Sequence, residues 1–126
     1  MDIGDAFLLA DARIEEHLWI VISLPGSDPE TVVIVSLTTL GDWKDQSCVL
    51  RPADHPWIKH ETCVSYRDAK CVPESKLDEL LKSNQLKPLA AASDELIGKI
   101  LEGAERTDEL PLRCVDVLAK QNLISK

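Results

Sequence analysis

Apolar and polar positions follow different periods in the two parts of the chain. Up to about residue 72, apolar residues come in short runs or alternate with polar ones, which is typical of strands. The later part spaces its leucines and isoleucines three and four positions apart, which predicts helices. The pattern therefore predicts one domain, 1–126, with a β portion over 1–72 and a helical portion over 73–126.

Short strands separated by turn signals are expected in the first part. The clearest separator is the cluster of proline, glycine, serine and aspartate at 25–29, which lies between two β-branched runs. The strands follow one another too closely to be joined by helices, so a parallel sheet is excluded. A small, strongly bent antiparallel barrel fits this spacing. The expected strands are 6–10, 18–23, 32–38, 47–50, 61–66 and 70–72.

Two or three helices are expected after Pro73, a residue favoured in a first helical turn. The first runs to about Ser83, the second begins at the N-cap residue Ser93, and a weaker third spans 111–121. Their apolar stripes are Leu77, Leu80 and Leu81; Leu96, Ile97, Ile100, Leu101 and Ala104; and Leu112, Val115, Leu118 and Ala119. We expect these stripes to pack against the sheet, giving an α+β fold. The last helix alternatively offers a face to a partner or a second copy.

Composition places the chain among soluble globular proteins. It has 126 residues, of which 44% are apolar and 29% charged. No apolar run approaches the ~20 residues that span a bilayer, and the acidic start lacks the basic region of a secretory signal. We therefore expect a cytoplasmic protein without a membrane segment.

The net charge of −8 argues against non-specific binding to nucleic acid, which needs clustered lysine and arginine. It does not exclude a local site. Basic residues recur between residues 44 and 70, so a surface that meets a phosphate chain is expected there. They are Lys44, Arg51, Lys59, Arg67 and Lys70.

The four cysteines lack the paired spacing of a structural zinc site. None forms a Cys-x-x-Cys pair, whereas structural zinc sites usually have ligands two to four residues apart. We interpret them as buried free thiols, with disulfides and a mixed Cys/His zinc site as lesser alternatives. They are Cys48, Cys63, Cys71 and Cys114.

Candidate chemistry gathers at strand ends. Thr38 and Thr39 close the most apolar run, His17 opens another strand, and His55 and His60 lie in a loop. Histidine carries protons near neutral pH, and hydroxyls donate hydrogen bonds to phosphate. Each residue also has a structural interpretation, because strand-end threonines bond to backbone and loop histidines stabilise turns.

Aromatic residues are scarce, at 4% of the chain, so each tryptophan is informative. Trp19 alternates with apolar residues within a strand, which indicates core. Trp43 and Trp57 lie in polar loops, where an exposed indole is able to stack on a base or simply to pack the loop. Tyr66 is open to both interpretations.

Several segments in succession resemble the PemK/MazF toxin family. Segment 4–11 resembles the family's opening Gly-Asp strand, and 17–23 resembles its second strand. Segments 35–39 and 48–50 are similar to its strand ending in Thr-Thr or Thr-Ser and to the strand after it. Segment 61–81 resembles its strand pair leading into a helix. The succession covers about residues 4–81.

The resemblance implies an SH3-like barrel with packed helices, often a homodimer. In the family this fold is a metal-independent endoribonuclease, a hydrolase that cleaves single-stranded RNA and is paired with an antitoxin protein. An arginine before the second strand and the Thr or Ser ending the third carry the site. Thr38 matches the latter, His17 stands in the place of the arginine, and Arg67-Asp68 replaces the usual Glu-Gln.

On this resemblance, His17 and Thr38 would flank the reacting phosphate, and His60 or His55 would supply the second proton carrier. Arg67 or Lys59 would hold the RNA backbone. The remaining expected substrate contacts are Thr39, Thr62, Tyr66, Trp57 and Trp43. No cofactor or metal is expected. The alternatives are a non-catalytic SH3-like module that binds a protein or peptide in the same groove and, third, a zinc protein.

Overall fold

The computed structural model describes residues 1–9, 17–26 and 30–126. In this part of the chain, six strands and three α-helices form an α+β fold, which confirms the predicted fold class. In chain order they are β1 Ala6–Leu9, β2 Leu18–Val21, β3 Thr31–Thr39, β4 Val49–Leu50, β5 Thr62–Pro73, α1 Glu74–Lys82, β6 Leu86–Leu89, α2 Asp94–Arg106 and α3 Leu112–Lys120, with a 3₁₀ turn at Pro52–Asp54.

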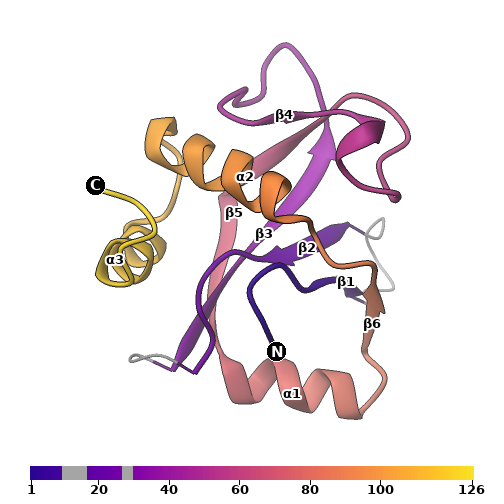
Figure 1. Cartoon of the computed structure of the whole chain (residues 1–126), viewed down its shortest axis with the longest axis vertical. Coiled ribbons are helices and arrows are strands. Elements are labelled where there is room, and N and C mark those ends of the chain that lie inside the picture. The colour runs from indigo at the N-terminus through magenta and orange to yellow at the C-terminus, as the bar shows by residue number, and fades with distance from the viewer. Residues whose placement is uncertain (10–16, 27–29) are drawn as a thin grey trace.

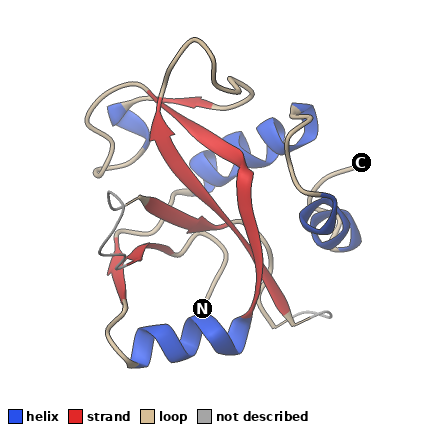
Figure 2. Cartoon of the chain, turned by 180° about the vertical axis from the view of Figure 1, so that it is seen from behind, coloured by secondary structure: helices blue, strands red, loops and turns tan. Residues whose placement is uncertain are grey.

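All six strands belong to one antiparallel sheet in the order β4-β5-β3-β2-β1-β6. The sheet curls into a half-barrel around its two longest strands, β3 and β5 (Figure 1). Helix α2 crosses the face turned to the viewer in Figure 1, and α3 lies beside it. From behind, the strands lie in front of α2, and α1 closes one end of the sheet (Figure 2).

Two features of the sheet differ from the expectation. The predicted strands 61–66 and 70–72 form one continuous strand, β5, because both pair with β3. Strand β6 was not predicted, since Lys87 and Pro88 interrupt its apolar pattern. Among the described strands it pairs with β1 alone and forms an edge, where a proline costs no ladder hydrogen bond. Ala10, the expected end of the first strand, lies outside the described residues.

The alternation of side chains along β3 separates two apolar clusters. Val33, Val35 and Leu37 face the larger core, to which α2 and α3 contribute. Val32 and Ile34 face the opposite way and pack with residues of α1. Farther along that second face, β3 carries polar side chains in place of apolar ones. The outer face of the sheet is therefore apolar toward α1 and polar toward the other end.

The helix boundaries follow local signals. Ser93 caps α2 as predicted, because its hydroxyl accepts a hydrogen bond from the Leu96 amide at 3.1 Å. Asn84 and Asn122, both with positive φ, follow the ends of α1 and α3. The expected inward face of α3 was partly wrong. Leu112 is 74% exposed, whereas Cys114 is buried.

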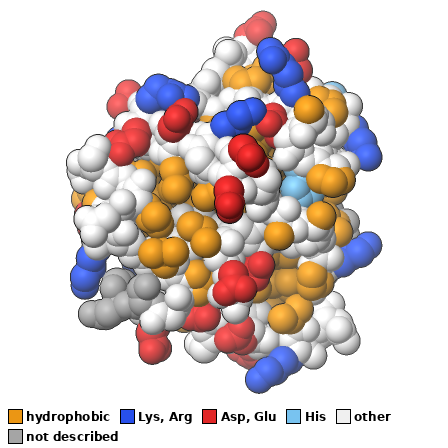
Figure 3. Space-filling model, viewed as in Figure 1, with side chains coloured by type: hydrophobic (Ala, Val, Ile, Leu, Met, Phe, Trp, Pro, Cys, Tyr) orange, Lys and Arg blue, Asp and Glu red, His pale blue; other side chains and the backbone are white. Residues whose placement is uncertain are grey.

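None of the helices in the described residues is long and apolar enough to cross a bilayer. On the face that carries α2, lysines and arginines are scattered among acidic side chains, with apolar side chains between them (Figure 3).

A wide bulge interrupts the pairing of β3 with β5. Ile34 pairs with Lys70 and Ser36 pairs with Ser65, so residues 66–69 of β5 lie opposite Val35 alone. A bulge bends the strand that carries it and re-aims its side chains. Within this one, Tyr66 points into the core while the next two side chains are exposed.

Tyr66 fastens the bulge to α2. Its ring is fully buried and its hydroxyl donates a hydrogen bond to the Ile100 carbonyl at 2.6 Å. Burial raises the pKa of this hydroxyl, which therefore remains a neutral donor. The helix approaches so closely because Gly103 has no side chain. A Cβ there would lie 2.2 Å from the Tyr66 oxygen and 2.8 Å from the Cys48 Cβ.

Gly103→Ala is expected to destabilise the fold by about 1–3 kcal/mol, because the added methyl group overpacks the contact between α2 and the bulge. Gly98 provides a matched control in the same helix, since a Cβ there would meet nothing within 4 Å. Gly98→Ala should stabilise by up to about 1 kcal/mol through helix propensity. Urea denaturation of both variants measures the difference. Equal effects would contradict the close contact.

Candidate functional site

A groove crosses the polar end of the outer sheet face, over β3 and the bulge of β5. Its inner part encloses about 270 Å³ and its outer part about 600 Å³. Both parts share Thr38, Ser65, Arg67 and Asp68. The inner part adds Trp43, Lys44, Asp45, Cys63, Val64 and Glu109, and the outer part adds His17, Trp19, Ser36, Ala69 and Lys70.

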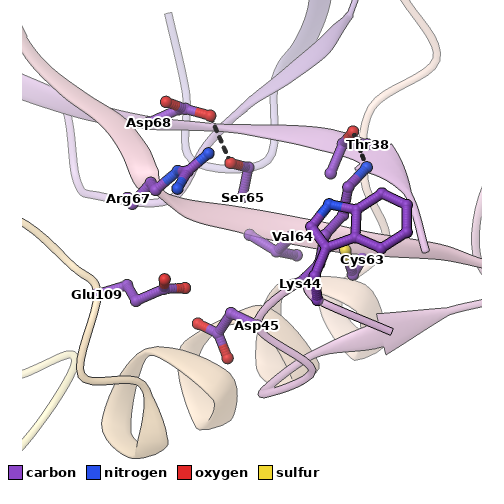
Figure 4. A pocket seen from close by; sticks show the side chains of 10 residues that line it. Thr38, Lys44, Asp45, Cys63, Val64, Ser65, Arg67, Asp68 and Glu109 are labelled. Atoms are coloured by element: carbon purple, nitrogen blue, oxygen red, sulfur yellow. Dashed lines mark hydrogen bonds between the residues drawn. The ribbon is translucent and has the colours of Figure 1, made fainter. Parts of the chain in front are cut away.

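The bulge supplies the middle of the groove. Arg67 and Asp68 are exposed, and the Ser65 hydroxyl donates to the Asp68 carboxylate at 2.6 Å (Figure 4). Arg67 makes no hydrogen bond or ion pair within 4.0 Å to the residues that the structure describes. Its guanidinium is thus a fixed positive charge whose five donors are open to a ligand.

The end of β3 supplies a second set of donors. Lys44 Nζ donates to the Thr38 hydroxyl at 3.0 Å and to the Thr39 carbonyl at 2.5 Å. Since the Thr38 oxygen accepts from Lys44, its own proton is available to another acceptor. Trp43, 84% exposed, lies next to this pair, with Lys44 Nζ 5.9 Å from its ring centroid. Its indole face is open to stacking.

His17 lies at the outer end of the groove. Its Nδ1 is 3.1 Å from the Leu37 carbonyl oxygen. Because a carbonyl only accepts, Nδ1 carries a hydrogen and Nε2 is the nitrogen left to take up or release a proton. At the same end, Lys70 Nζ lies 5.9 Å from the ring centroid of Trp19. Trp19 is half-buried, so it belongs both to the apolar cluster and to the groove wall.

Two carboxylates occupy the inner end, Asp45 and Glu109, and they point toward each other (Figure 4). Burial raises the pKa of Asp45, but hydrogen bonds from Ser47 and Thr107 outweigh burial and leave the pKa lowered. Glu109 is exposed, and a small loss of hydration together with the hydrogen bond and charge of the neighbouring Asp45 carboxylate raises its pKa, against the opposing charge of Arg67. The pair thus holds one firmly ionised group beside one that keeps its proton more readily.

His55 does not reach the groove. It is 3% exposed, its Nε2 lies 2.6 Å from the Ala90 carbonyl oxygen, and its Nδ1 accepts from the Trp57 amide at 3.0 Å. These bonds fix a neutral tautomer with both nitrogens in use. The same loop is tied to α2 by the Asp54–Lys99 ion pair at 2.6 Å. His55 therefore joins its own loop to the segment after β6 and does not line the groove.

The other predicted site residues divide into three groups. Thr62 and Tyr66 are buried, and their hydroxyls donate to the carbonyls of His60 and Ile100. Four lie outside the groove lining: Thr39, Lys59 and His60 on the surface, and Trp57 packed against the core. Four predicted residues do share the groove, namely His17, Thr38, Trp43 and Arg67.

Several groove residues were not among the sequence-predicted site residues. Lys44 and Lys70 belonged to the basic stretch that the sequence marked, and Asp68 follows Arg67. Glu109 gave no signal, because it comes from the connection between α2 and α3, far from the strands in sequence. Asp45 lies in a polar loop where its Thr107 partner was not foreseeable.

In residues 1–9, 17–26 and 30–126, no group of three or more His, Cys, Asp or Glu side chains is arranged to hold a metal ion. Comparison of the chain with models of known protein families, with curated proteins and with solved structures found no match. The functional argument therefore rests on the groove itself.

His55→Ala is expected to lower stability by about 2–3 kcal/mol, because it removes a buried ring and leaves the Trp57 amide and the Ala90 carbonyl unpaired. His60→Ala, at an exposed position, should change stability by less than about 0.5 kcal/mol. Thermal and urea denaturation compare the two. A His55→Ala protein as stable as the wild type would contradict a stabilising role for the two hydrogen bonds of His55.

Asp45→Asn should lower stability by about 1–2 kcal/mol at neutral pH, because an amide nitrogen cannot accept the Thr107 hydroxyl. The folded-state pKa of Asp45 lies below its ordinary value of 3.8. The stabilisation is therefore present above that value and is lost as the pH falls through the folded-state pKa.

Urea denaturation at about pH 7 and about pH 2.5 should show the gap between wild type and Asp45→Asn narrowing in acid. Asp42→Asn is the control, since Asp42 is exposed and makes no hydrogen bond or ion pair with the described residues. A gap of constant size would mean that the ionised carboxylate does not supply the stabilisation.

Proposed function

We propose that this chain is a metal-independent endoribonuclease of the PemK/MazF kind that cleaves single-stranded RNA in the cytoplasm. The observation that carries the proposal is that His17, Thr38 and Arg67, from three separate segments, line one groove. Cleavage by a ribose 2′-hydroxyl needs this set of groups: a base for the hydroxyl proton, an acid for the leaving oxygen and donors for the phosphoryl charge.

The donors lie in the middle of the groove. Arg67 offers two parallel hydrogen bonds to phosphate, and the Thr38 hydroxyl, held by Lys44, offers a third. Lys44 also brings a positive charge to the same place. The Thr38 hydroxyl and Lys44 are held in place before substrate arrives by their hydrogen bonds at the end of β3, and the bulge places the backbone of Arg67 beside them. Such preorganised donors stabilise charge that develops in the transition state.

The proton carriers lie at opposite ends. His17 lines the outer part and Glu109 the inner part, with Arg67 and Thr38 common to both. In a phosphoryl displacement the attacking and leaving oxygens lie roughly in line, so a base and an acid are needed on opposite sides of the phosphorus. We assign the base to His17 Nε2 and the acid to Glu109, because the two side chains lie at opposite ends of the groove and the neighbouring Asp45 carboxylate raises the pKa of Glu109.

Acidic side chains restrict what the groove accepts. Asp45 and Asp68, and Glu109 whenever it is ionised, repel a continuous phosphate chain, so only a locally exposed phosphate with a neighbouring base on Trp43 fits well. Single-stranded RNA offers splayed bases for such stacking. We propose that an antitoxin-like protein covers this groove when the enzyme is held inactive, with the homodimer of the family as a further expectation.

One observation favours the alternative, a non-catalytic module that binds a protein or peptide. The same three carboxylates and the exposed Trp43 indole match a peptide segment carrying lysine or arginine, through ion pairs and cation–π contact. This occupant would use the groove without a reaction. The two functions differ in whether RNA is cut.

The purified full chain, incubated with labelled single-stranded RNA of mixed sequence in EDTA, is expected to release fragments that end in a 2′,3′-cyclic phosphate. Arg67→Ala and Thr38→Val should each lower the single-turnover rate by about 10²-fold, because each removes a transition-state donor. Gel electrophoresis of the products measures both rates.

Lys76→Ala is the charge-matched control, since Lys76 is exposed on α1 and pairs only weakly with Glu79 at 4.0 Å. It should cut RNA at the wild-type rate. RNA that stays intact at every concentration of the wild-type protein would contradict the nuclease. If a lysine-rich peptide also binds, and Glu109→Gln weakens that binding, the result would support the binding module. Fragments that persist in Arg67→Ala and Thr38→Val would reveal a contaminating nuclease.

A further inference from the structure

Two cysteines from distant parts of the chain meet beneath α3. Cys71 lies on β5 and Cys114 in the first turn of α3, and their Sγ atoms are 3.3 Å apart. Helix α3 packs against both β3 and β5, so the approach is part of the folded core. A disulfide bond is about 2.05 Å long, so the two sulfur atoms would need to move together by about 1.2 Å.

The two thiols differ in access. Cys71 is half-buried and reachable from solvent, whereas Cys114 is 1% exposed. A hydrogen bond from Cys114 lowers the pKa of Cys71, with burial opposing it and Arg113 assisting it. The same contact and burial raise the pKa of Cys114. The half-buried Cys71 thiol therefore ionises before the buried Cys114 thiol, which is the pattern of an attacking cysteine with a resolving partner.

The other two cysteines lack this combination. Cys48 and Cys63 are 4% and 1% exposed, and burial raises the pKa of Cys48 to about 11 and also that of Cys63. Neither forms a sulfur–sulfur contact within the described residues. They serve as internal references for a site-selective reaction.

We propose that Cys71 and Cys114 form a reversible redox modification site that reacts with low-molecular-weight disulfides such as oxidised glutathione. The Cys71 thiolate attacks one sulfur of glutathione disulfide, forms a mixed disulfide and releases one glutathione thiolate. Cys114 then loses its proton to solvent and attacks the Cys71 sulfur. This step forms the internal disulfide and releases the second glutathione. Two protein thiols are oxidised and one glutathione disulfide is reduced.

The bond would join β5 to α3 across the 43 positions from residue 71 to residue 114 (114 − 71). Closing a loop of this length restricts the unfolded chain, so the oxidised protein should be the more stable form. Lys70, which precedes Cys71, lines the outer part of the groove, whereas Cys71 packs against the larger core. The site does not depend on the proposed nuclease activity.

The test incubates the full chain with oxidised glutathione, quenches it in acid and records the intact mass with peptide mapping. Wild type is expected to lose two hydrogen atoms, with the bond mapped to Cys71 and Cys114. Cys114→Ala should instead retain one glutathione on Cys71, and Cys71→Ser should remain unmodified. Cys63→Ala is the matched control and should form the internal disulfide like wild type.

Thermal denaturation provides a second measurement on unmutated protein. The oxidised form should melt several degrees higher than the reduced form and return to the original Tm after treatment with dithiothreitol. A stable glutathione adduct on wild type, a disulfide that maps to any other pair, or wild type that stays fully reduced would each overturn the proposal.

Discussion

The hydrogen bond between the Tyr66 hydroxyl and the Ile100 carbonyl is the constraint on which the groove depends. It lies inside the core and joins the middle of β5 to the middle of α2. The bond forms only because Gly103 lets the helix come so near. Because Tyr66 is held inward, the next two residues of the bulge, Arg67 and Asp68, are exposed on the outer face and line the groove. The contact between Tyr66 and α2 on the core face of the sheet thus determines which side chains line the groove on the outer face.

The same arrangement explains why the histidines have different surroundings. His55 lies on the core side of the sheet, where its loop docks against α2 and the segment after β6. His17 lies on the outer side, beside the polar end of β3. His55, buried with two hydrogen bonds, contributes to stability, whereas His17 faces the groove and its Nε2 makes no hydrogen bond to the described residues. The side of the sheet on which each histidine lies therefore distinguishes the two, whereas their positions in the sequence did not.

Local signals predicted most elements, and contacts between distant segments explain most differences. The Ser93 cap and the apolar periods of β3 and α2 are local, so they were predictable. Edge strand β6 exists only because β1 needs a partner, and its own residues favour no strand. Among the groove residues, Thr38 was predicted from a strand end, and Arg67 from the basic stretch and the family resemblance. Glu109 joins them through the fold of a connection that carries no motif.

The permanent positive charge of the groove comes from Arg67, on the bulge of β5. In the family that the sequence resembles, an arginine precedes the second strand, and here His17 stands at that position. Arg67 restores a permanent guanidinium from the bulge of β5, in the same groove. On the proposed function, Arg67 would bind phosphate and His17 would transfer the proton, so the two tasks would fall to separate residues. Such a separation would explain why His17 occupies a position at which phosphate binding alone would favour an arginine.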